Sequence, residues 1–234
     1  MVIAIVLLTS IVVAGQKPKI WTQPKTAWGD PDLQGTWTSD DSIQVPLQRP
    51  ANIGDRLTAT EDEIAQREAN IARLAQADSQ EVAGPNARVG TGPPGHWGER
   101  ARRPSKQTSL VVDPPDGRIP ALTPEGQKRQ AEIAANRLGA GGQQRPAASY
   151  ENFTYYIRCI TRGVTGSMFP VIYGNGTQIV QSPGYVAILN EMVHEARIVP
   201  LDGRPHAGKN IRTYMGDSRG HWEGNTLVVE TTNI

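Results

Sequence analysis

The chain has 234 residues, enough for one domain with a sizeable core and extensions. Its 24 lysines and arginines nearly balance its 23 aspartates and glutamates, which excludes a strong net field that would recruit nucleic acid or an anionic membrane. Glycine (24) and proline (18) are abundant and phenylalanine is scarce (2), a composition that favours a loop-rich protein over a helical bundle.

The chain begins with an apolar run typical of an export signal. Residues 2–14 match the length of a signal-peptide h-region and are too few for a membrane span, which needs roughly 20 residues. We therefore expect residues 1–15 to be a signal peptide, the protein to be secreted or periplasmic, and no stable membrane insertion after cleavage. No basic residue precedes the run, which leaves open a buried strand, an uncleaved anchor or a start further upstream.

An extended segment is expected at residues 16–59. Within it, Gly35-Thr36-Trp37 resembles the opening Gly-x-Trp strand of calycin-type barrels, in which the tryptophan closes one end of the barrel.

Residues 60–149 are predicted to be a helical and loop-rich region. Thr60 and Glu63 can form a capping box, which begins a helix that runs to Ala77. Thr123 caps a second helix that ends at Gly139. The other predicted features are flexible linkers at 79–107 and 139–148, and a short strand at 109–112 closed by a turn at 113–117.

Residues 150–234 are predicted to be an antiparallel β domain. Hairpins are expected at 177–191 around Ser182-Pro183-Gly184 and at 220–232 around Gly224-Asn225, with a strand at 193–201 between them. The fold class is then mainly β with two helices (α+β), an antiparallel meander that forms a calycin-like barrel or a sandwich. Because the chain stops within a strand-like segment, we expect the β domain to continue beyond Ile234.

The single cysteine, Cys159, excludes a disulfide within the chain. It lies at 155–160, where the sequence predicts a strand, and a buried small hydrophobe is favoured over a reactive thiol.

Several segments together resemble a family of exported bacterial proteins without an assigned function. They are 158–163 (RCITRG), 178–185 (QIVQSPGY), 198–206 (IVPLDGRPH) and 216–233 (GDSRGHWEGNTLVVETTN), with weaker likeness at 113–120 and 35–37. Relatives generally continue past the last hairpin with further β segments. The resemblance implies a secreted β-rich protein, and it implies neither an activity nor catalytic residues.

The stretch from Asp217 to Glu223 holds the candidate catalytic residues. Because side chains alternate along a strand, one face carries Asp217, Arg219, His221 and Glu223. Such a row suits general acid–base chemistry, with Asp217, His221 and Glu223 as the catalytic residues. The same row is equally suited to a charge ladder on a solvated face.

The candidate ligand-binding residues are His194, Arg204, His206 and Arg219. His194 is expected in a strand, on an apolar face, as a satisfied core residue or as the group that orients a ligand. Its Glu191-x-x-His194 spacing suits a metal only on a helix, so no metal site is expected. Arg204 and His206 are expected at a barrel mouth, where arginine binds carboxylate or phosphate; alternatively Arg204 pairs with a nearby acid and fixes the loop.

Three functional hypotheses follow. The first is an exported protein that binds a small, partly apolar molecule in the concavity of a β-sheet. The second is a cofactor-free hydrolase, lyase or isomerase that uses a His/acid pair, with His221 or His194 as the base. The third is a structural or interaction protein of the cell envelope. The sequence contains no nucleophile elbow, Walker loop or dinucleotide fingerprint, so no cofactor is expected. Whether the protein is an enzyme, its ligand and its oligomeric state stay open.

Overall fold

The computed structural model describes residues 21–78, 98–136 and 146–234. The chain divides into two units, Met1–Asp32 and Leu33–Ile234. The predicted signal peptide lies outside the described residues. In the first unit, Lys25 pairs with Pro31 across a tight turn in which the Trp28 indole donates to Asp30. The rest of the description concerns the second unit.

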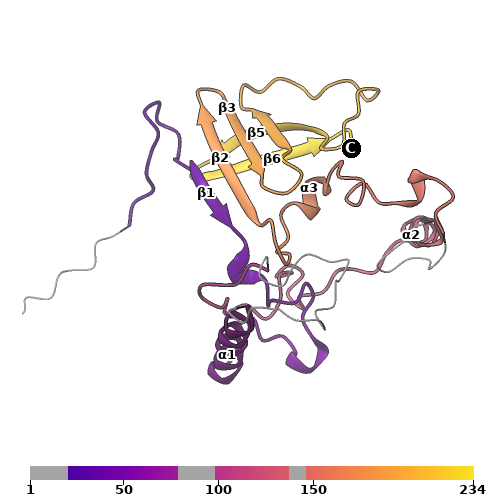
Figure 1. Cartoon of the computed structure of the whole chain (residues 1–234). Coiled ribbons are helices and arrows are strands. Elements are labelled where there is room, and N and C mark those ends of the chain that lie inside the picture. The colour runs from indigo at the N-terminus through magenta and orange to yellow at the C-terminus, as the bar shows by residue number, and fades with distance from the viewer. Residues whose placement is uncertain (1–20, 79–97, 137–145) are drawn as a thin grey trace, which may run out of the picture. The chain divides into compact units, whose positions relative to one another are not determined.

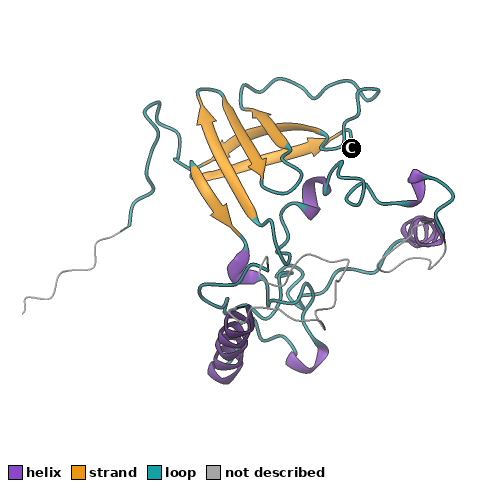
Figure 2. Ribbon diagram, in the orientation of Figure 1, coloured by secondary structure: helices purple, strands orange, loops and turns teal. Residues whose placement is uncertain are grey.

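The second unit has a mixed α+β fold, as the sequence predicts. Figure 2 shows its helices and strands. The helices are α1 (Glu61–Asp78), α2 (Pro124–Asn136) and the short α3 (Gly163–Gly166). The strands are β1 (Gly35–Thr38), β2 (Gly176–Ser182), β3 (Tyr185–Asn190), β4 (Ala196–Pro200), β5 (Asp217–Glu223) and β6 (Thr226–Thr232).

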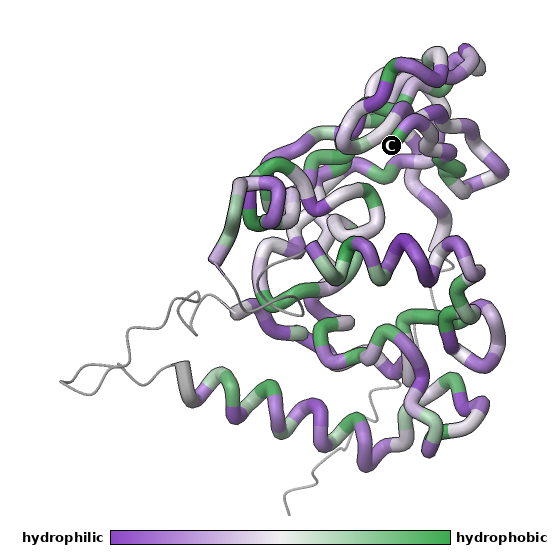
Figure 3. The backbone as a smooth tube through the Cα atoms, turned by 90° about the vertical axis from the view of Figure 1, so that its right-hand side faces the viewer, coloured by the Kyte–Doolittle hydropathy of each residue, from purple (hydrophilic) through white to green (hydrophobic). Residues whose placement is uncertain are grey.

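The starts of the two long helices are confirmed. At α1, the Glu63 backbone N–H donates to Thr60 Oγ1 at 3.2 Å, and Glu63 Oε2 accepts from the Thr60 N–H at 2.8 Å. Apolar residues recur at successive turns of α1 (Figure 3). At α2, Thr123 Oγ1 accepts from the Gly126 N–H at 3.1 Å. The predicted helix end at Gly139 and most of the two linkers lie outside the described residues.

The strands form two antiparallel sheets, with the orders β1-β2-β3-β4 and β5-β6 (Figure 1). Both predicted hairpins are confirmed, because Ser182 pairs with Tyr185 and Glu223 pairs with Thr226. The described strands close no barrel, so the calycin-like barrel stays a prediction. Trp37 on β1 is 53% exposed and its indole donates to the Leu33 carbonyl, so it does not cover a core.

The core of the sheet lies on one face only. Val186 on β3 and Val199 on β4 are paired and fully buried. The next row, Val180–Ala187–Ile198, points to the opposite face, where Val180 and Ile198 are about half exposed. On β5, Gly220 lies against Leu201 and Val199, since a Cβ added there would be 2.8 Å from side-chain atoms of both. The missing side chain of Gly220 therefore allows β5 to pack closely on β4.

Two predicted strands, at 109–112 and 155–160, are wrong, and a third begins later than predicted. Residues 109–112 form no strand. The Leu110 N–H donates to the carbonyl of Pro46, but Pro46 has no N–H with which to continue a ladder of strand hydrogen bonds. The predicted turn after them does form, with the Gly117 N–H donating to the Pro114 carbonyl at 2.8 Å.

Residues 155–160 form turns instead of a strand, because their amides bond locally; the Ile160 N–H donates to the Tyr155 carbonyl at 2.8 Å. Cys159 has a φ of 56° and is exposed, so it is not a buried hydrophobe. The strand predicted from residue 193 begins only at Ala196, because Val193 and His194 have positive φ in the turn between β3 and β4.

Candidate functional site

An open hollow of about 1070 Å³ lies beside α3 and is lined by three tyrosines, so we name it the tyrosine pocket. Its lining comes from residues 154–156 and 161–163, from Glu195 after the β3–β4 turn, from residues 212–214 between β4 and β5, and from Ile234. The pocket therefore forms where irregular segments from distant parts of the sequence meet.

The first wall of the pocket consists of residues 154–156 and 161–163, and Arg162 holds it in place. Its guanidinium donates to the carbonyls of Tyr173 and Gly174 at 3.3 and 3.4 Å and lies 5.0 Å above the ring of Tyr156. The Tyr156 hydroxyl is 3.3 Å from that of Tyr173. This hydrogen bond and the guanidinium lower the pKa of Tyr156 below its ordinary value. Tyr156 is thus oriented by Arg162, which also lines the pocket, and by Tyr173, which lies outside it.

The second wall carries Tyr214, whose ring meets that of Tyr155 edge to face, with the centroids 5.1 Å apart and the planes at 64°. The neighbouring Thr213 N–H donates to the carbonyl of Asn233, and Asn233 Nδ2 donates to the carbonyl of Ala207. Buried Thr161 also contacts Met215, with Oγ1 3.3 Å from Sδ. These bonds attach the second wall to the end of β6 and to the first wall.

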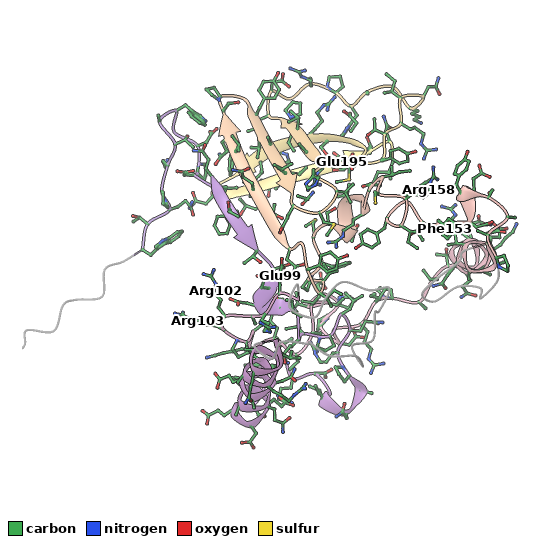
Figure 4. All side chains as sticks on the ribbon, in the orientation of Figure 1. Glu99, Arg102, Arg103, Phe153, Arg158 and Glu195 are labelled. Atoms are coloured by element: carbon green, nitrogen blue, oxygen red, sulfur yellow. The ribbon has the colours of Figure 1, made fainter. Side chains whose placement is uncertain are left out.

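Glu195 lies on the sheet side of the pocket. Its Oε2 atom is buried and has no hydrogen-bond partner in the described part of the chain. In Figure 4, Glu195 lies close to the strands, while Phe153 and Arg158 lie toward α2. A second hollow of about 580 Å³, lined partly by α2, shares Thr154 and Tyr155 with the tyrosine pocket.

The structure brings three of the predicted site residues together outside this pocket. Asp217 accepts from Arg219 Nη1 at 2.6 Å and from the Ala207 N–H at 2.8 Å, and it lies 3.0 Å from His206 Nδ1. Burial alone would raise the pKa of Asp217, but these three contacts outweigh burial and hold the pKa below its ordinary value. His206 Nε2 faces the Glu230 carboxylate at 3.8 Å. The cluster thus fixes the start of the loop between β4 and β5.

His221 and Glu223 form a separate pair on the same face of β5, with Nε2 3.1 Å from Oε1. Both side chains are more than 60% exposed. The alternation predicted along this strand places Asp217 beside Arg219 and His221 beside Glu223. The exposed His221–Glu223 pair fits the alternative of paired charges on a solvated face, whereas Asp217 and Arg219 are only 20% exposed.

Arg204 and His194 lie on other surfaces. Arg204 donates through Nε to both oxygens of Asp202, at 2.9 and 2.7 Å, and through Nη2 to the Tyr185 hydroxyl at 3.0 Å. The hydrogen bonds from Arg204 lower the pKa of Asp202. His194 is exposed in the β3–β4 turn, and the Glu191 carboxylate accepts from the Gly176 N–H. Within residues 21–78, 98–136 and 146–234, no three His, Cys, Asp or Glu side chains are grouped to hold a metal ion.

A carboxyl pair, Asp40 and Glu99, lies near η1 (Asp40–Ser42). Burial and the hydrogen bond with Asp40 raise the pKa of Glu99, whereas hydrogen bonds with Glu99, Asn175 and Thr38 outweigh burial and lower the pKa of Asp40. Glu99 also accepts from the backbone N–H groups of Gly174 and Asn175. These bonds join the residues before β2 to η1.

Sequence reasoning missed the residues of the tyrosine pocket. The one sequence feature that points to them is the tyrosine content, because three of the six tyrosines in the chain line the pocket. Comparison with protein-family models, curated proteins and solved structures gave no match to this chain. Among the helices that the structure describes, none is both long enough and apolar enough to cross a bilayer.

Proposed function

We propose that this is an exported protein that binds a small, partly apolar molecule in the tyrosine pocket. The observation that carries the proposal is the combination, in one hollow, of the Tyr155–Tyr214 ring pair with a buried Glu195 oxygen that lacks a partner in the described residues. Ligand pockets are typically apolar hollows of roughly 300–1,000 Å³ with a few polar groups that orient the ligand.

The walls suit a flat aromatic molecule. An edge-to-face ring contact is worth about 0.5–1.5 kcal/mol beyond its buried area, and a third ring would gain similar contacts with Tyr155 and Tyr214. Arg212, at the edge of the pocket, supplies a cation for an acidic substituent. The export part of the proposal rests on the apolar run at residues 2–14 and on the family resemblance.

The test is a fluorescence titration of the purified chain with 1-anilinonaphthalene-8-sulfonate, an aromatic anion that emits in apolar surroundings. We expect saturable 1:1 binding that weakens about tenfold in Tyr214→Ala, which corresponds to the loss of about 1.4 kcal/mol of contact energy. Tyr214→Phe should bind the dye like the wild type, because it keeps the ring.

Tyr185→Ala is the matched control, since Tyr185 lies on β3 outside the pocket. Circular dichroism of each variant checks that the fold is retained. Dye binding that is absent, or that falls equally in Tyr185→Ala and Tyr214→Ala, would refute the proposal.

A further inference from the structure

A further hollow, of about 480 Å³, is lined by one face of α1 and by the segment at 102–106. We name it the basic hollow, because the segment contributes three cationic side chains, those of Arg102, Arg103 and Lys106. None of its lining residues belongs to the tyrosine pocket, so the two sites are separate. Its volume is within the range of roughly 300–1,000 Å³ that is typical of small-molecule sites.

The segment that carries the three cations is anchored through its backbone. The Asp41 carboxylate accepts from the N–H groups of Arg102 and Arg103 at 2.9 and 3.2 Å. The Ser105 N–H donates to the Asp41 carbonyl at 3.0 Å, and Arg67 on α1 donates to the Ser105 carbonyl. Because main-chain atoms of the segment make these bonds, a substitution of one of its cationic side chains leaves the anchoring in place.

The positive charge of the basic hollow is not balanced by the described part of the chain. Residues 99–106 contain four basic side chains and one acid, although the chain as a whole is almost neutral. Arg102, Arg103 and Lys106 form no salt bridge with any described residue, and Glu68 is the one acid in the lining. In Figure 4, Arg102 and Arg103 lie next to η1 and point away from the ribbon. The complementary ligand is therefore an anion.

The wall that α1 contributes is apolar. Ile64 and Ile71 are seven residues apart in the helix, which places them on one face, and Ala72 follows on the same face. The two isoleucines are half-buried and Ala72 is exposed, so this wall is accessible to a ligand. An inorganic anion would leave the apolar wall unused, whereas each CH₂ group buried against it strengthens binding up to about fourfold.

We propose that the basic hollow binds a single-chain anionic amphiphile, namely a carboxylate with an alkyl chain of medium length. The chain lies along Ile64, Ile71 and Ala72, and the carboxylate is held by Arg102 and Arg103, because a planar guanidinium binds a carboxylate through two parallel hydrogen bonds. This binding activity goes beyond the proposed function, since it does not involve the tyrosine pocket.

Isothermal titration calorimetry of the purified chain tests the proposal with three probes. Octanoate has both parts of the ligand, butyrate has the same head group with a shorter chain, and 1-octanol has the chain without the charge. We expect octanoate to bind at least about tenfold more tightly than either, because butyrate loses four CH₂ contacts and 1-octanol loses the charged hydrogen bonds. Equal binding of octanoate and either of the other probes would overturn the proposal.

Ala72→Glu and Ala69→Glu are a matched pair of variants. Both alanines are exposed on α1, but only Ala72 lines the basic hollow. A carboxylate at position 72 should repel the ligand and weaken octanoate binding at least about tenfold, whereas Ala69→Glu and Tyr214→Ala should bind octanoate like the wild type. Circular dichroism checks that each variant is folded.

Three results would show that the inference is wrong. Octanoate does not bind, Ala72→Glu and Ala69→Glu bind it equally well, or Tyr214→Ala alone loses it, which would place octanoate in the tyrosine pocket. The proposed function is tested separately by the dye titration, so the two proposals can fail independently.

Discussion

The Asp217 carboxylate contacts three donors around it, namely His206, the Ala207 backbone and Arg219. Arg219 also donates through Nε to the carbonyl of Pro205 at 3.2 Å. The cluster therefore holds residues 205–207, at the start of the loop that later carries Tyr214. Residues that the sequence suggested for catalysis and ligand binding thus act, in this structure, on the shape of the loop.

We predict that Asp217→Asn lowers the free energy of unfolding by roughly 1–3 kcal/mol at pH 7, because it weakens bonds to an ionised and largely buried acceptor. Urea denaturation measures this. Asp202→Asn, which alters an exposed ion pair, should cost at most about 1 kcal/mol.

The pH dependence of this difference has a defined sign. A carboxyl whose folded pKa is lowered stabilises the protein above its ordinary pKa of 3.8, and this contribution is lost as the pH falls through the lower folded pKa. The difference between wild type and Asp217→Asn should be constant from pH 7 to about pH 5 and shrink below pH 3.8. A difference that instead shrinks between pH 7 and 5 would contradict this assignment.

At the scale of elements, β4 and β5 come from different sheets and meet at Gly220. A side chain there would overlap the methyl groups of Val199 and Leu201, at 2.8 Å, and approach the Val228 carbonyl at 3.3 Å. Close packing at this one position brings the β5–β6 hairpin onto the buried face of the larger sheet.

We predict that Gly220→Ala destabilises the protein by roughly 1–3 kcal/mol, the usual cost of forcing an extra carbon into a packed core. Gly208→Ala is the control, since a Cβ at Gly208 meets no atom within 4 Å. Thermal unfolding followed by circular dichroism compares the two. Equal melting temperatures for both variants would show that β4 and β5 are not closely packed at Gly220.

At the scale of the whole molecule, the features that the sequence predicts correctly are those with a local cause. The capping box of Thr60 and Glu63 needs only neighbouring residues, and Pro183-Gly184 and Gly224-Asn225 each define a two-residue turn. The strand predicted at 193–201 forms at Ala196–Pro200, and only its start was predicted wrongly, because no glycine in the sequence indicates the positive φ of Val193 and His194. The predicted strand at 155–160 is wrong because local turns satisfy its amides.

The tyrosine pocket could not be predicted from the sequence. Its walls have no periodic pattern, and they meet through tertiary contacts such as Thr161 with Met215 and Tyr155 with Tyr214. Only the folded chain brings Glu195 to the same hollow. The sequence hypothesis of a small partly apolar ligand therefore stays a proposal, now attached to different residues.

The position of the bound ligand tests the central proposal most directly. Cys159 is the single cysteine, is exposed and lies between the lining stretches 154–156 and 161–163, so a nitroxide can be attached there alone. We predict that the nitroxide broadens the proton NMR lines of bound 1-anilinonaphthalene-8-sulfonate, and that reduction with ascorbate restores them. Binding of the dye without any broadening would place the ligand elsewhere and contradict the tyrosine pocket as the site.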